Sequence, residues 1–245
     1  MAIPLDRIAN MPSYAPYYVM PPTRYRRMRA HTVLFRADPA AVDAVLPACL
    51  APSDDGICAA VGIDAPWTSS YGAFQASLLF AKCHFEDTPG YFMVVEFLNS
   101  RSSIPAGREI WGTPKVWAEM RVWMDERVMI TDSGLGGVSI FSIRSTLHRA
   151  CEPTELPDLR PSWRLKVIPR ADGPGADVLQ LIDGSAAQQD VVTHVARAGD
   201  GVVEFRPSPV YDLSAFEPRA YLGAWYVESD HTETYGRIVR DFLRG

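Results

Sequence analysis

The 245-residue chain is predicted to have an α+β fold that is predominantly antiparallel β: a closed β-barrel or cone with a few peripheral helices. Most of its apolar segments are short, rich in β-branched and aromatic residues, and separated by turn-forming clusters. Residues 115–124 alternate between two faces, as a half-buried strand does. No repeat or low-complexity linker interrupts this pattern, so residues 1–245 are expected to form a single domain. Closure of the sheet would leave no edge strand exposed.

The first half of the chain is expected to contain one short helix among strands. Asp38 is a suitable N-cap residue, Pro39 fits the first helical position, and Pro47 ends the helix. Apolar stretches bounded by Pro, Gly and Asp predict the strands, and Ser103 to Gly112 has room for one or two helical turns. The strands expected here cover residues 31–36, 57–63, 74–85 and 91–99.

The second half is expected to be almost entirely β. The glycine-rich run 133–137 lies between two predicted strands with no helix after it, so it indicates a hairpin turn and not a nucleotide-binding loop. Residues 235–243 fit either a helix or a last strand. The strands expected here cover residues 115–124, 128–132, 138–147, 163–168, 178–182, 191–196 and 202–206.

Composition excludes several classes of partner and cofactor. The net charge is −5 without a basic stripe, which argues against nucleic acid or an anionic membrane surface as a partner. No apolar run approaches the roughly 18 to 20 residues that span a bilayer, and the N-terminus lacks a signal pattern, so a cytoplasmic location is expected. The histidines and cysteines show no metal-ligand spacing, and there is no G-x-S-x-G serine-hydrolase motif. We therefore expect neither a metal nor a cofactor.

Lysine is rare in this chain. Of 24 Lys plus Arg residues, only Lys82, Lys115 and Lys166 are lysines. Where arginine is the default cation, a lysine can mark the need for an amine that loses its proton.

One of these lysines lies in a specific motif. The run from Gly107 to Lys115, Gly-Arg-Glu-Ile-Trp-Gly-Thr-Pro-Lys, resembles the signature of the acetoacetate decarboxylase superfamily. Residues 163–173 are similar to the second recurrent block of that family, and residues 29–47 are similar to its N-terminal strand and helix. The resemblance implies an acetoacetate decarboxylase-like fold, a homo-oligomer, and a small keto acid as the partner.

The resemblance also implies that Lys115 is a catalytic nucleophile that forms an imine with a ketone. A free lysine has a pKa near 10.4, so only about one in two thousand is neutral at pH 7. Burial in an apolar pocket favours the neutral amine because it disfavours the ammonium ion. Trp111, Val116 and Trp117 are expected to form that pocket together with nearby apolar strands.

Three positions depart from the decarboxylases of the family. Those enzymes usually follow the nucleophile with a second lysine, where this chain has Val116, and they carry two pocket glutamates, which correspond to Val61 and Ala76. Gln75 is adjacent and could orient a carboxylate if the correspondence slips by one residue. These departures weaken the prediction of decarboxylation but leave the nucleophile assigned.

The remaining site candidates are charged or aromatic. The substrate-binding arginine of the family corresponds to the region of Met28, so Arg27 and Arg29 are both candidates. Arg108 and Glu109 either touch the substrate or pair with each other to brace the lysine loop. The acid–base candidates are Glu96, Tyr226 and a polar segment that contains Glu228, Asp230, His231 and Glu233. This segment is expected to be a loop, with capping of the pocket and supply of an acid as the alternative.

Three functions remain open at this stage. The first is an imine-dependent lyase of the aldolase-dehydratase or hydratase type acting on a 2-oxo acid. The second is a β-keto acid decarboxylase, and the third is a non-catalytic ligand-binding relative. The intact Pro114-Lys115 motif argues against the third.

Overall fold

The computed structural model, which describes residues 3–244, joins the strands into one 15-stranded sheet. Neighbouring strands are antiparallel except where β6 meets β11 and β7 (Lys115–Trp117). The short strands β2 (Ala51–Pro52) and β4 (Trp67–Thr68) pair with β5 and β1. The main path through the sheet is β15 (Arg237–Asp241), β12 (Ala176–Asp183), β11 (Ser162–Pro169), β6 (Thr88–Leu98), β5 (Phe74–Phe85), β3 (Ile57–Ala65), β1 (Thr23–Arg36), β14 (Ala220–Glu233), β13 (Gln188–Phe205), β10 (Val138–Ala150), β9 (Val128–Leu135) and β8 (Glu119–Asp125).

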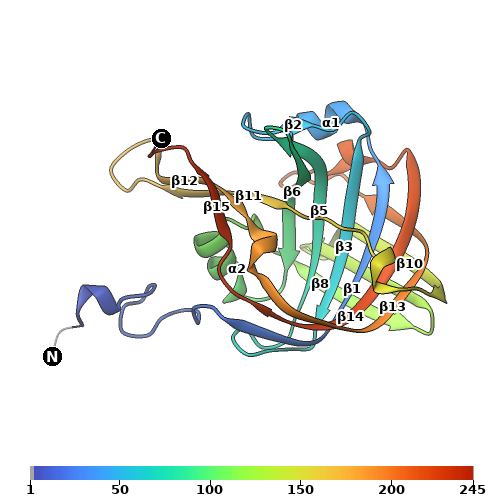
Figure 1. Cartoon of the computed structure of the whole chain (residues 1–245), viewed down its shortest axis with the longest axis horizontal. Helices are drawn as coiled ribbons and strands as arrows, with labels where there is room; N and C mark the ends of the chain where they lie inside the picture. The colour runs from blue at the N-terminus through green and yellow to red at the C-terminus, as the bar shows by residue number, and fades with distance from the viewer. Residues whose placement is uncertain (1–2, 245) are drawn as a thin grey trace.

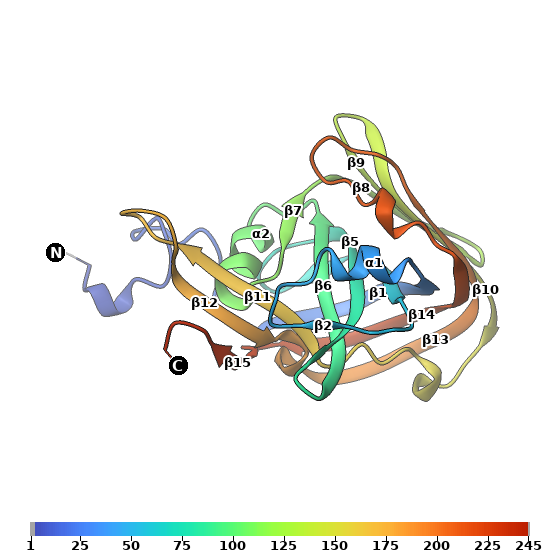
Figure 2. The same cartoon turned by 90° about the horizontal axis from the view of Figure 1, so that it is seen from above.

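The sheet is mainly antiparallel, as predicted, but the prediction that it closes is wrong. The path begins at β15 and ends at β8, and no ladder between residues 3 and 244 joins these two strands. Figure 2 shows them on opposite sides of the molecule. The cause is a fork at β6, whose edge pairs with β11 near Tyr91 and with β7 near Glu96. Strands β11, β12 and β15 therefore diverge from the other strands (Figure 1).

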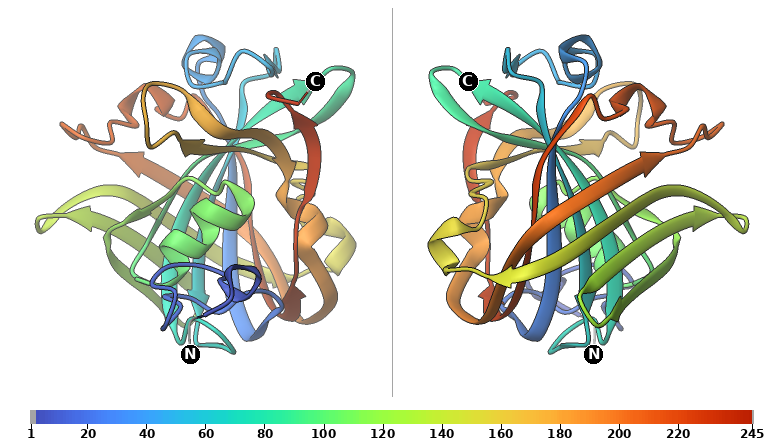
Figure 3. Two further views of the ribbon diagram at one scale, coloured as in Figure 1. Left: turned by 90° about the vertical axis from the view of Figure 1, so that its left-hand side faces the viewer. Right: turned by 90° about the vertical axis from the view of Figure 1, so that its right-hand side faces the viewer.

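The helices are few and short, as the sequence predicts. Helix α1 (Pro39–Asp43) begins where Asp38 accepts a hydrogen bond from the backbone N–H of Ala40. Helix α2 (Ser103–Ala106) continues as the π-helical turn η2 (Gly107–Trp111), which ends at Gly112 with φ 69°. The left view of Figure 3 shows this helical segment beside the N-terminal arm, residues 3–22, which precedes β1. The hydroxyl of Tyr18 in the arm donates to Glu109 of η2 at 2.6 Å.

Two regions differ from their predicted structure. Residues 115–124 are not one strand, because Ala118 separates β7 from β8 and each pairs with a different neighbour. The polar segment around Glu228 is not a loop but part of β14, which lies between β1 and β13. Its polar residues pair with polar or aromatic residues of β1, such as Glu228 with Arg29 and His231 with Tyr25. The segment therefore lacks the alternation of apolar and polar residues from which a strand is predicted.

Alternation along the strands separates two apolar cores. On β5, Phe74, Leu78 and Phe80 belong to one core, whereas Leu79 belongs to the other. The first core also contains Val61 and lines the functional site described below. The glycine turn predicted at residues 133–137 is present, since Gly136 and Gly137 join β9 to β10 with positive φ. Within residues 3–244, no helix has the length and apolar character needed to cross a bilayer.

Candidate functional site

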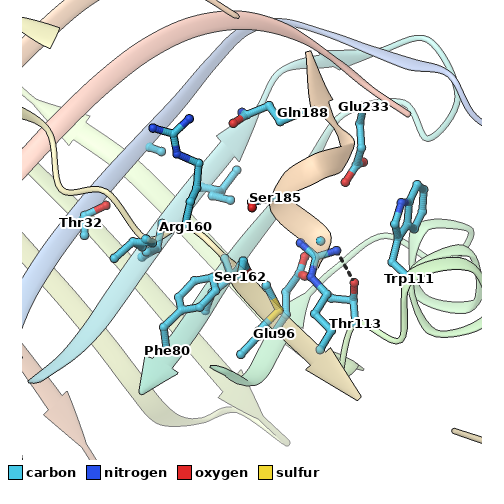
Figure 4. A pocket seen from close by; sticks show the side chains of 18 of the residues that line it. Thr32, Phe80, Glu96, Trp111, Thr113, Arg160, Ser162, Ser185, Gln188 and Glu233 are labelled. Carbon is cyan, nitrogen blue, oxygen red and sulfur yellow. Dashed lines mark hydrogen bonds between the residues drawn. The ribbon is translucent and has the colours of Figure 1, made fainter. Parts of the chain in front are cut away.

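A cavity of about 380 Å³ opens on one face of the sheet. Polar groups gather around its apolar wall, as Figure 4 shows for Glu96, Thr113 and Glu233. They come from β6, from the lysine loop and from β14. The cavity therefore combines water exclusion with convergent hydrogen-bonding groups, which is typical of small-molecule sites. The apolar wall consists of Met28, Ala30, Val61, Ile63, Phe74, Leu78, Phe80 and Met93.

Lys115 projects its amine into this cavity from β7. Its side chain is only 10% exposed, and its Nζ donates to the hydroxyl of Ser103 at 2.7 Å. The same Nζ lies 3.6 Å from Oε1 of Glu96. The parallel pairing of β6 with β7 sets this position, because Glu96 and Lys115 are direct partners in the ladder. The amine is thus held between a hydroxyl and a carboxyl group.

Gly107 makes room for the lysine side chain. A Cβ atom at this position would lie 2.4 Å from Cδ of Lys115 and 2.7 Å from its Cε. Glycine is therefore required by close packing, since its φ is an ordinary helical −62°. The glycine of the Gly-Arg-Glu triplet leaves room for the side chain of Lys115 by having no side chain of its own.

Glu96 is the buried acid beside the lysine. Burial raises the pKa of its carboxyl group, and the nearby Lys115 and Arg164 oppose this rise. The second cavity carboxylate, Glu233, repels it and raises the pKa further. A carboxyl group of this kind gains and loses a proton closer to neutral pH than an exposed glutamate does.

Arg164 reaches the cavity from β11. Its Nη1 donates to the hydroxyl of Thr113 at 2.9 Å, the bond drawn dashed in Figure 4. Thr113 in turn accepts a 2.7 Å hydrogen bond from the backbone N–H of Lys115 through its carbonyl oxygen. Arg164 is therefore connected to the lysine through the loop that carries it.

A second polar group in the cavity joins β1 to β14. The hydroxyl of Tyr25 donates to Glu233 at 3.0 Å, and its ring stacks on His231 with centroids 4.4 Å apart. Burial, followed by the neighbouring Glu233, raises the pKa of Tyr25 well above its ordinary value. Burial lowers the pKa of His231, so its ring is neutral at pH 7.

The sequence and fold match proteins of known family. The family model described as acetoacetate decarboxylase (ADC) matches residues 10–243. The chain belongs to the acetoacetate decarboxylase family. This membership, which the sequence motifs predicted, indicates that it is an enzyme.

Individual relatives and solved structures with a similar fold match nearly the whole chain. The acetoacetate decarboxylase of Chromobacterium violaceum is 26% identical over 244 residues, covering 98% of this chain and 97% of its own. The acetoacetate decarboxylase structure from Legionella pneumophila has a TM-score of 0.86 at 24% identity, with 98% and 96% coverage. The enduracididine biosynthesis enzyme MppR, solved with the condensation product of pyruvate and imidazole 4-carboxaldehyde, has a TM-score of 0.80 at 18% identity, with 96% and 97% coverage.

The two glutamate positions inferred from the family resemblance are apolar in this member. Val61 lines the cavity, and the buried Ala76 belongs to the same core. Trp111 also lines the cavity, with its indole N–H bonded to the carbonyl oxygen of Thr234 at 2.9 Å. The prediction that Val116 and Trp117 form the pocket is wrong: Val116 packs in the other core, on the opposite face of β7 from Lys115, and Trp117 is 47% exposed. A lysine in place of Val116 would therefore point away from Lys115.

Arg27, Arg29 and Gln75 lie outside the cavity, so the structure does not bring them to Lys115. Arg27 is exposed and pairs with Glu228 at 2.8 Å, and Arg29 lies 3.5 Å from Asp64. Met28, which lies between the two arginines, lines the cavity. Alternation from Met28 through Ala30 to Thr32 turns Arg29 away from the cavity, and Arg27 lies in a β-bulge with φ 52°.

The amide of Gln75 also faces away from the cavity. Its side chain bonds both the carbonyl oxygen and the N–H of Val122, at 3.0 Å and 3.2 Å. It therefore connects β5 to β8 as a structural group.

Arg108 and Glu109 do not pair with each other, and neither lines the cavity. Arg108 donates to the backbone carbonyl of Lys115 at 3.2 Å, so it braces the lysine loop directly. Tyr226 and Glu228 line a different cavity of about 280 Å³, together with Arg29. Among the acid–base candidates, Glu96 lies beside Lys115, and His231 and Glu233 of the polar segment line the same cavity.

Several polar residues at the cavity were not singled out individually from the sequence, among them Arg164 and Tyr25 in its lining and Ser103 beside the lysine amine. Ser103 and Arg164 belong to segments that the sequence analysis recognised, but neither residue carried a motif of its own. Tyr25 and His231 are brought together by the pairing of β1 with β14. Within residues 3–244, no group of three or more His, Cys, Asp or Glu side chains could hold a metal ion.

Proposed function

We propose that this enzyme is a lyase that forms a Schiff base between Lys115 and a small keto acid. The observation that carries the proposal is the buried amine of Lys115, held between Ser103 and Glu96 in an apolar-walled cavity. Glu96 accepts a proton from the ammonium group, which leaves a neutral amine. The amine attacks the ketone carbon, a C–N bond forms, and the carbonyl oxygen leaves as water after taking up two protons. Nucleophilic catalysis by lysine requires this neutral form.

The protonated imine then draws electrons from the neighbouring carbon. For a 2-oxo acid, loss of a proton from the α-carbon gives an enamine, which can add to an aldehyde or take part in loss or addition of water. Glu96 has the position and the raised pKa to carry this proton, because it lies 3.6 Å from the lysine nitrogen. We therefore favour aldolase-dehydratase or hydratase chemistry. The complex of MppR with a pyruvate condensation product supports this choice by analogy of fold.

Decarboxylation of a β-keto acid is the second candidate. It is favoured by the sequence match to curated acetoacetate decarboxylases along 98% of the chain. Against it, Val61, Ala76 and Val116 occupy positions where charged residues are expected in the decarboxylases. We expect acetoacetate decarboxylation far below the usual enzyme turnover of about 1 to 1,000 per second.

Two measurements separate the candidates. Sodium borohydride should trap pyruvate on the peptide that contains Lys115, as detected by mass spectrometry. In D₂O, the enzyme should exchange the methyl protons of pyruvate, which NMR follows, while releasing little CO₂ from acetoacetate. Rapid CO₂ release without exchange would favour the decarboxylase, and no trapping with either acid would reject Schiff-base chemistry.

A further inference from the structure

The guanidinium group of Arg164 lines the cavity without an acidic partner. Among residues 3–244, no carboxylate oxygen lies within ion-pair distance of it, and its Nε is buried without a hydrogen-bond partner. Its Nη1 bonds only the neutral hydroxyl of Thr113. A buried donor of this kind is normally satisfied, so the free Nε indicates a missing acceptor.

The other arginine in the cavity lining differs in both respects. Arg160 binds Asp158 through two hydrogen bonds of 2.7 Å and 2.9 Å, and its side chain is 70% exposed. Its fork is therefore already occupied by a carboxylate. Arg164 is the cavity arginine whose Nε has no acceptor.

The fold holds the Arg164 guanidinium in place from two sides. Thr113 binds one nitrogen, and Gly184 of the 3₁₀ turn η4 (Gly184–Ala187) packs against the plane of the group. A Cβ at Gly184 would come within 2.3 Å of both Cζ and Nε of Arg164. The position is therefore built before any ligand arrives, which reduces the entropy lost on binding.

Arg164 also lies at the nucleophile end of the cavity. Thr113, which it binds, precedes Lys115 by two residues, and its charge acts on Glu96 together with that of Lys115. A ligand that reaches the lysine amine thus passes within the field of a second fixed cation. Arginine matches a carboxylate through two parallel N–H groups, and the Nε–Nη2 edge is such a pair.

We propose that Arg164 binds the substrate carboxylate through its Nε–Nη2 edge and thereby selects 2-oxo acids whose carboxylate is retained in the product. This inference rests on the Schiff-base function proposed above. A fixed cation stabilises a carboxylate more than the neutral CO₂ that it would become, so it slows decarboxylation of the carboxylate it holds. Binding through Arg164 therefore favours proton loss at the α-carbon.

The first test compares a charged ketone with a neutral one. Borohydride trapping is measured against concentration for pyruvate and for acetone, in the wild type and in Arg164→Gln. The variant should raise the half-saturating concentration of pyruvate at least tenfold and leave that of acetone within about twofold. Arg164→Lys, which keeps the charge but loses the fork, should fall between the two for pyruvate. An equal loss with both ketones, or no change with either, overturns the proposal.

The second test does not depend on imine formation. L-Lactate has a carboxylate but no ketone, and its binding is followed by saturation-transfer NMR. Lys115→Ala should keep lactate binding and Arg164→Gln should lose it, whereas the exposed Arg27→Gln serves as the matched control and should keep it. If the wild type traps no ketone but the variants bind lactate as described, the Schiff-base proposal is rejected and the role of Arg164 stands. Lactate binding by Arg164→Gln, or none by the wild type, would reject the role of Arg164.

Discussion

The position of the Lys115 amine is set by the residues around it. The amine has two polar contacts, with Ser103 and Glu96, and the methylene groups of the lysine side chain lie against Gly107. Glu96 comes from β6, whereas Ser103 and Gly107 come from the α2–η2 helical segment, so the geometry is lost if either segment moves. Two substitutions separate the chemistry of the lysine from its packing.

Lys115→Arg should abolish borohydride trapping and turnover although it keeps the positive charge. Arginine has a pKa above about 12, so it does not supply a neutral nucleophile. Lys115→Ala should give the same result, with folding checked by circular dichroism and a melting curve. Near wild-type activity in a folded Lys115→Arg variant would remove the basis of the proposed function.

The other lysines provide the controls for that experiment. Burial lowers the pKa of Lys166, which makes it the main rival amine, but Lys166 does not line the cavity. Lys82 pairs with Asp55 at 2.5 Å. Trapping should therefore survive in Lys166→Arg and in Lys82→Arg, and the trapped peptide should contain Lys115 in both.

Gly107→Ala should displace the side chain of Lys115 and leave the fold largely intact. The added Cβ would lie 2.4 Å from Cδ of Lys115, so the side chain must move. Misplacement by about 1 Å can cost on the order of 100-fold in rate, and we expect a loss of that size in the trapping rate. Gly173→Ala is the matched control, since nothing lies within 4 Å of a Cβ at that position. Equal rates for the two variants would contradict the packing argument.

At the scale of elements, buried polar bonds tie the strands together across the sheet interior. The ring of His31 in β1 bonds Ser145 of β10 and Thr131 of β9, each at 2.8 Å. Burial lowers the pKa of His31 to about 3, so the ring is neutral in the folded enzyme over most of the acid range. This connection joins β1 to two strands that are not its neighbours in the sheet.

The buried His31 should make the fold sensitive to acid. Below pH 6.5 the unfolded chain binds a proton at this histidine, whereas the folded chain does not until about pH 3. The unfolded state then binds more protons than the folded state. As the pH is lowered through that window, the free energy of unfolding therefore falls by about 1.4 kcal/mol per pH unit. Urea unfolding of the wild type and His31→Gln between pH 6.5 and 4.5 measures the difference in slope. Equal slopes of unfolding free energy against pH for the two proteins would mean that His31 binds its proton equally in the folded and unfolded states, which contradicts the prediction.

At the scale of the whole molecule, the N-terminal arm extends away from the sheet (Figure 1). It leaves large apolar side chains in solvent, with Leu5, Met11 and Tyr14 each at least 80% exposed. Isolated exposed apolar residues are ordinary, but a group on one extended arm is typical of a contact with another molecule. The homo-oligomer implied by family resemblance would cover these residues.

We therefore predict that the intact chain is an oligomer at micromolar concentration. Replacing Leu5, Met11 and Tyr14 together by serine should shift it toward the monomer, as measured by light scattering after gel filtration. Val210→Ser removes an exposed apolar side chain outside the arm and should leave the mass unchanged. A monomeric wild type would contradict this prediction.

The sequence by itself determined the family, the mainly antiparallel sheet and the motif that carries Lys115, because each depends on local information. A strand pattern, a capped helix after Asp38 and a motif of nine residues ending in Lys115 are all readable along the chain. The single peptide step between Lys115 and Val116 also placed them on opposite faces in advance.

Only the tertiary structure decided which other side chains reach the lysine. Glu96, Arg164 and Glu233 lie on three strands, β6, β11 and β14, and their distances depend on strand order and register. A shift of one residue would turn each of them to the other face, which is how Met28 rather than Arg27 or Arg29 comes to line the cavity. The open sheet likewise follows from how the edge of β6 divides between two partners, a long-range choice that no local pattern encodes.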